Sequence, residues 1–127
     1  MRYMLVGLAV LVVAAIVIGC GAGARKAKAS GFGKPIPADM PVTTARELND
    51  NPQAFEGKEV LVAGKVTSEC PSGGWIWVKD ETGDVYVNMH PTNVFIPQHV
   101  NGQVRAMGRV VLESGRPQIV GIGLELR

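Results

Sequence analysis

The sequence predicts an all-β fold, a small barrel of five short strands with one short helix on its N-terminal side. Apolar and polar side chains alternate with a period of two in five short segments. No long helical pattern follows residue 54, and glycine and proline separate the segments. With 127 residues, the chain has room for one small core.

The helix is expected from Ala45 to Asp50. Thr44 is followed three residues later by Glu47, which is the spacing of a capping box, where each side chain binds the other residue's backbone amide. Asn51-Pro52 then interrupts the helix. The folded domain is therefore expected to begin at residue 43.

The strands follow from the alternation. They are expected within residues 58–69, 75–79, 84–89, 103–112 and 118–126, with 75–79 and 84–89 paired as a hairpin. Gly64 lies within the first strand, where a small barrel has to bend sharply. The alternation places these residues in the core: Val62, Val66, Ile76, Val78, Val87, Val104, Val110 and Ile122.

Three segments together resemble OB-fold domains of bacteria and archaea. NPQAFEGKEVLVAGKV (51–66) is similar to their entry and first strand. WIWVKDETGDVYV (75–87) is similar to their second and third strands joined by an Asp-x-Thr-Gly turn, and NGQVRAMGRVV (101–111) to their fourth strand. The resemblance covers about residues 48–126 and implies a five-stranded OB-type barrel, a fold that hosts unrelated functions.

The domain also resembles a group of small exported bacterial proteins of unknown function. Their OB-like barrel carries a Cys followed a few residues later by Gly-Cys-Trp. The corresponding loop here keeps Cys70 and Trp75 but has Gly74 in place of the second Cys. Any role of a Cys pair in those relatives is therefore not implied for this chain.

The N-terminus has the pattern of a lipoprotein leader. After Arg2, residues 4–18 form 15 residues without a charged side chain, which as a helix would be about 22 Å long and too short for a ~30 Å hydrocarbon core. Val17-Ile18-Gly19-Cys20 resembles the bacterial lipobox, in which the Cys thiol is acylated and becomes the new N-terminus. The alternative is a buried Cys20 near the end of a membrane helix.

The segment after Cys20, residues 20–42, is expected to be a flexible tether. It is rich in Gly, Ala, Lys and Pro and has almost no apolar periodicity. Its four basic residues either lie against anionic headgroups or are simply solvated. They are Arg25, Lys26, Lys28 and Lys34.

One face of the hairpin is expected to carry the binding residues. If Ile76 and Val78 point into the core, alternation turns two tryptophans and a tyrosine outward. The ligand-binding residues predicted from this register are Trp75, Trp77, Lys79, Tyr86 and Asn88. OB domains commonly bind ligands on this face. The alternative is that the tether, the helix or a second subunit covers the tryptophan pair.

Charge argues against nucleic acid as the ligand. Residues 43–127 contain eight basic and ten acidic residues, whereas backbone binding needs clustered Lys and Arg. An envelope protein, a glycan or a small molecule fits better. The sequence contains no catalytic, phosphate-binding or dinucleotide motif, so we expect no enzyme activity and no cofactor.

An alternative hypothesis is a metal or redox protein that uses Cys70 with His90 and possibly His99. These are the soft and imidazole ligands of the mature domain, but they do not have zinc-site spacing.

The sequence thus predicts a signal peptide at 1–19, a lipid-anchored tether at 20–42 and an OB-fold domain at 43–127. Together these form a binding or assembly module in the cell envelope, outside the cytoplasm.

Overall fold

The computed structural model describes residues 30–127, so the predicted signal peptide, Cys20 and the first part of the tether lie outside the described residues. Six strands make up most of this part of the chain, namely β1 (Ser30–Gly33), β2 (Glu59–Glu69), β3 (Trp75–Lys79), β4 (Asp84–Asn88), β5 (Gln103–Glu113) and β6 (Arg116–Leu126). Two short helices, α1 (Ala45–Asp50) and α2 (Pro52–Phe55), precede β2, and a 3₁₀ turn (His90–Thr92) follows β4. Within residues 30–127, no helix is both long enough and apolar enough to span a membrane.

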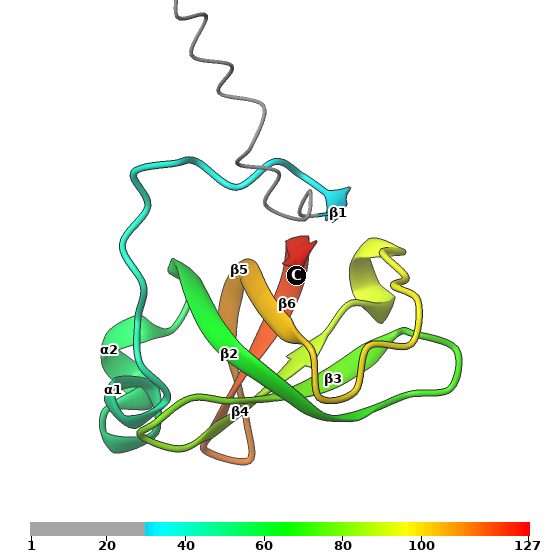
Figure 1. Cartoon of the computed structure of the whole chain (residues 1–127). Helices are drawn as coiled ribbons and strands as arrows, with labels where there is room; N and C mark the ends of the chain where they lie inside the picture. Colours follow the sequence, from blue (N-terminus) through cyan, green and yellow to red (C-terminus); the bar gives the residue numbers. More distant parts are fainter. Residues whose placement is uncertain (1–29) are drawn as a thin grey trace, which may run out of the picture.

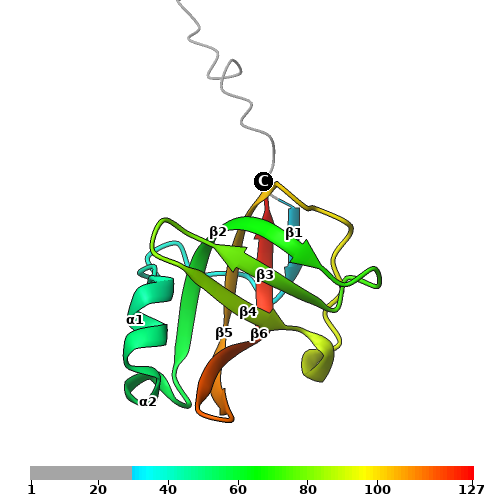
Figure 2. The same cartoon turned by 90° about the horizontal axis from the view of Figure 1, so that it is seen from below.

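Strands β2 to β6 close into a five-stranded barrel (Figure 1 and, from below, Figure 2), which is the predicted OB-type architecture. The strand order is β1-β6-β4-β3-β2-β5, and an antiparallel β5–β6 pairing closes the ring. The link between β4 and β6 is parallel and short, joining only Val87 and Asn88 to Ile119 and Val120. The barrel is therefore weakly closed on that side.

The first strand bends where the sequence predicts. Gly64 lies where β2 finishes pairing with β5 and begins to pair with β3. A Cβ at this position would overlap the carbonyl group of Lys79. Glycine is therefore required here by the close approach of two backbones.

Most of the predicted core is confirmed. Seven of the eight predicted positions are buried, namely Val62, Val66, Ile76, Val78, Val87, Val104 and Val110. The prediction for Ile122 is wrong, because this residue is only half-buried. The β5–β6 register shifts between Met107, which pairs with Gly123, and Gly108, which pairs with Gly121. This bulge reverses the alternation along β6, so Ile119 before the bulge and Leu124 after it are both buried, while Ile122 between them is turned away from the core.

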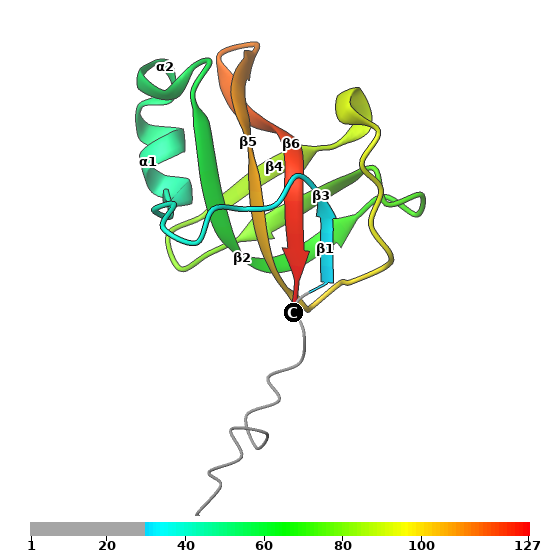
Figure 3. The ribbon, with the colours of Figure 1, turned by 90° about the horizontal axis from the view of Figure 1, so that it is seen from above.

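Part of the predicted tether is packed on the barrel. β1 pairs antiparallel with the last residues of β6, from Ser30 opposite Leu126 to Gly33 opposite Gly123. The chain then crosses the outside of the barrel (Figure 3) to a parallel bridge between Val42 and Leu61. Residues 30–42 therefore differ from the expected flexible linker. We call residues 30–42 the strap.

The strap explains two buried side chains that face away from the main core. Leu61 and Met107 are cross-strand partners on β2 and β5, and both are buried although they lie outside the main core cluster. The Thr43 amide donates to the Leu61 carbonyl, and the carbonyl of Lys34 lies beside Gly123 close to the Met107 methyl group. The strap therefore covers a second, smaller apolar cluster.

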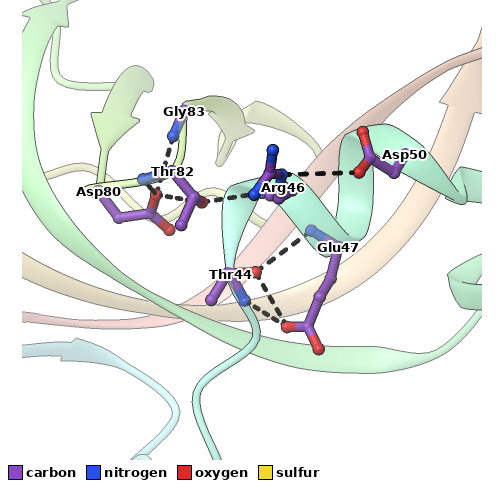
Figure 4. Close-up of polar contacts among 7 residues, drawn as sticks. All are labelled: Thr44, Arg46, Glu47, Asp50, Asp80, Thr82 and Gly83. Carbon is purple, nitrogen blue, oxygen red and sulfur yellow. Dashed lines mark hydrogen bonds and ion pairs between the residues drawn. The ribbon is translucent and has the colours of Figure 1, made fainter.

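The predicted helix and its capping box are confirmed. α1 covers Ala45–Asp50, the Thr44 hydroxyl accepts from the Glu47 amide, and the Glu47 carboxylate accepts from the Thr44 amide at 2.8 Å. An ion pair between Arg46 and Asp50 lies on the exposed side of the helix (Figure 4).

The β3–β4 turn holds the start of α1 against the barrel. The Asp80 carboxylate accepts hydrogen bonds from the amides of Thr82 and Gly83 and from the Thr82 hydroxyl. Its other oxygen accepts from the Ala45 amide at 2.8 Å, and the Thr82 hydroxyl accepts from the Arg46 amide (Figure 4 draws the turn and the Arg46 contact). Burial raises the pKa of Asp80, but these hydrogen bonds outweigh it and leave the pKa below its ordinary value.

We expect Asp80→Ala to lower the free energy of unfolding by about 1–2 kcal/mol at pH 7, since it leaves helix and turn amides without their acceptor. Because the folded-state pKa is lowered, this contribution is present above the unfolded-state value of about 4 and is lost as the pH falls through the folded-state pKa. Urea denaturation at pH 7 and at acidic pH measures both effects. Glu81→Ala, in the same turn but exposed, is the control and should change little.

Candidate functional site

The outer face of the β3–β4 hairpin carries a row of three aromatic rings. Trp77 and Tyr86 are directly opposite each other, with ring centroids 5.2 Å apart and planes tilted by 57°. Trp75 lies on the other side of Tyr86, at a centroid distance of 5.9 Å. Trp77 is the most exposed of the three, with 41% of its surface accessible. We call Trp75, Tyr86 and Trp77 the aromatic row.

The two polar residues predicted for this face differ in their surroundings. Lys79 is exposed and lies opposite Asp84 at the turn end of the hairpin. Asn88 is half-buried opposite Trp75, and its side-chain oxygen accepts from the His90 amide at 3.1 Å. The Asn88 side chain thus supports the 3₁₀ turn, and its contact with a ligand stays a prediction.

The aromatic row borders a cavity of about 630 Å³. Trp77 and Tyr86 line it from the hairpin, Asn49 lines it from α1, and the β5–β6 hairpin supplies the opposite wall. The residues on that wall are Glu113, Gly115, Arg116, Pro117 and Gln118. These wall residues were missed by sequence reasoning, because they follow no motif and reach the site only through barrel closure.

The surroundings of Tyr86 change its acidity. Burial raises the pKa of the Tyr86 hydroxyl, and negative charge on Cys70 and on Glu113 raises it further. The Glu113 carboxylate accepts a hydrogen bond from the side-chain amide of Gln118 at 2.9 Å. Tyr86 is therefore a neutral aromatic ring at physiological pH, suited to stacking and to donating a hydrogen bond.

Cys70 lies in the loop between β2 and β3, next to the Trp75 end of the aromatic row. Its thiol is 2.9 Å from the Ser72 hydroxyl, and its amide donates to the Trp75 carbonyl. The hydroxyl and the amide of Ser72 lower the pKa of Cys70, with smaller contributions from the amides of Gly74 and Gly73 and against the opposing effect of burial. The thiol is partly exposed.

His90 fills the place that a second cysteine would need. A Cβ on Gly74 would overlap the His90 ring, which also stacks edge-on with Phe95 at 5.8 Å. A cysteine at position 74 would therefore require the His90 ring to move.

The imidazoles do not form a metal site with Cys70. The His99 ring nitrogen lies within hydrogen-bond distance of the carbonyls of Gln103 and Arg127, at the end of the barrel where the chain terminates. Among residues 30–127, no three His, Cys, Asp or Glu side chains gather in a way that could hold a metal ion. The alternative of a site built from Cys70, His90 and His99 therefore has no support in this geometry.

No protein family model matches the sequence, and no curated protein is similar enough to count as a relative. Solved structures share the fold. Asparaginyl-tRNA synthetase from Pyrococcus horikoshii, complexed with asparaginyl-adenylate, superposes with a TM-score of 0.58 and 20% identity over 68% of this chain. The match spans 22% of the synthetase, about a fifth of its length.

The hypothetical protein ygiW from E. coli is similar over nearly its whole length. It superposes with a TM-score of 0.52 and 19% identity over 77% of this chain and 99% of its own. At these identities the similarity establishes a common OB-type fold and nothing about ligands or reactions. The chain is thus an OB-fold domain, a fold widely used for binding.

Proposed function

We propose that this chain is a non-enzymatic binding module of the cell envelope, which captures a ligand or partner on the aromatic row. The observation that carries the proposal is the exposure of Trp77 beside Tyr86 at the edge of a cavity. A tryptophan that is 41% accessible exposes apolar surface to water. Burying such surface against another molecule contributes ~25 cal/mol per Å² to the free energy of binding.

We further propose that the module is tethered outside the cytoplasm by an acylated Cys20. The lipobox-like Val17-Ile18-Gly19-Cys20 sequence supports this. Mass spectrometry of the native protein should then find a chain that begins at an acylated Cys20, and Cys20→Ser should block its maturation. A mature chain that keeps Met1 would contradict lipid anchoring while leaving the binding proposal intact.

We expect Trp77→Ala, alone or with Tyr86→Ala, to abolish capture of the partner while the barrel stays folded. Crosslinking of the full chain in intact membranes, followed by purification, compares the proteins and ligands captured by each variant. Circular dichroism checks the fold. Phe95→Ala is the matched control, because Phe95 is exposed to a similar degree on the loop after the 3₁₀ turn. The proposal fails if Trp77→Ala captures the same molecules as the native chain, or if it unfolds the domain.

A further inference from the structure

The cavity beside the aromatic row lies where the barrel opens. β4 pairs with β6 only at Val87 and Asn88, so the first half of β4 runs free of β6 and faces the start of that strand across the cavity. Pro117 lines the β6 side, and its nitrogen carries no hydrogen to donate to a ladder. The opening therefore results from the short pairing between β4 and β6.

The cavity combines an aromatic floor with planar polar side chains from separate elements. Trp77 and Tyr86 provide the rings. The polar side chains are Asn49 on α1, Asp84 on β4, Glu113 on β5, and Arg116 and Gln118 on β6. Amide, carboxylate and guanidinium groups offer both donors and acceptors around the rings. Such an arrangement matches a ligand with apolar faces and a hydroxylated rim.

The charges in and around the cavity nearly balance. The lining carries two carboxylates, Asp84 and Glu113, and one guanidinium, Arg116. Lys79 lies outside the lining, opposite Asp84 in the hairpin, and adds a second positive charge. A site for a phosphate or a polyanion would need clustered basic groups. A bound cation would be repelled by the guanidinium that lines this cavity. The balance favours an uncharged ligand that binds through hydrogen bonds.

We propose that this cavity binds a neutral oligosaccharide, with sugar rings stacked on Trp77 and Tyr86 and their hydroxyls bound by the polar rim. This rests on the proposed binding function of the aromatic row. The C–H faces of a sugar ring are apolar and pack on an aromatic ring, while its hydroxyls require paired donors and acceptors. The cavity volume, about 630 Å³, lies within the range of ligand pockets, and the third ring, Trp75, extends the platform beyond a single sugar.

The test titrates the full chain with defined trisaccharides. N-acetylglucosamine trimer, cellotriose and maltotriose are the neutral probes, while glucosamine trimer and galacturonic acid trimer are the cationic and anionic comparators. Trp75 and Trp77 are the chain's two tryptophans, so intrinsic fluorescence reports directly on the aromatic row. We expect a saturable change with at least one neutral trimer and binding at least about threefold weaker for both charged trimers.

Variants separate stacking from charge. Trp77→Ala should raise the Kd for the neutral trimer by about tenfold or more, since stacking is lost. Glu113→Gln and Arg116→Gln remove a charge from the polar rim but keep hydrogen-bonding atoms, so each should weaken binding of the neutral trimer measurably but less than Trp77→Ala does. Phe95→Ala should leave the Kd for the neutral trimer unchanged.

Two results would overturn the oligosaccharide proposal. One is that none of the neutral trimers binds at ligand concentrations up to about 10 mM. The other is tighter binding of a charged trimer that is lost in Glu113→Gln or Arg116→Gln. In either case, Trp77-dependent capture of another partner from intact membranes would show that the proposed binding function survives.

Discussion

Ile76→Ala is expected to lower the free energy of unfolding by about 3 kcal/mol, a large share of the stability of so small a domain. Ile76 is fully buried in β3, where it lies opposite Val87 on β4. Its truncation removes apolar contacts and leaves a cavity that a closed barrel is unable to fill by moving one strand. Urea denaturation followed by circular dichroism measures the loss.

Ile122→Ala removes the same atoms from the outer side of the barrel and serves as the matched control. Because the β5–β6 bulge leaves Ile122 half-buried, we expect a loss of about 1 kcal/mol or less. Equal losses for the two variants would contradict the register described for β6.

Removal of the strap is expected to have an effect of similar size. A chain that begins at Thr43 loses the β1–β6 pairing and uncovers Leu61 and Met107, which should lower the free energy of unfolding by about 3 kcal/mol. A chain that begins at Ser30 should match the full chain in the same denaturation experiment. If the chain from Thr43 is equally stable, residues 30–42 act only as a linker.

Leu61→Ala provides a second check on the strap. If the strap stabilises the barrel by covering Leu61, its removal should cost less in the Leu61→Ala chain than in the native one. Additive losses would show that the strap contributes through β1 alone.

The sequence by itself determined the features that depend on near neighbours along the chain. The capping box of α1 follows from two residues three positions apart, and the outward aromatic row follows from alternation within β3 and β4. Most of the core followed for the same reason, since side chains in an extended strand must alternate between its two faces. Lipid anchoring at Cys20 is likewise a prediction from a local motif.

Only the tertiary structure decided what depends on how distant strands meet. The place of Ile122 was set by a bulge in the β5–β6 register, which no pattern within β6 reveals. The strap packs on the barrel because Leu61 and Met107 lie side by side on adjacent strands and form an apolar surface that it covers. The cavity beside the aromatic row arose in the same way, since Asn49, Glu113 and Arg116 meet there only because α1 and the β5–β6 hairpin pack around the open side of β4.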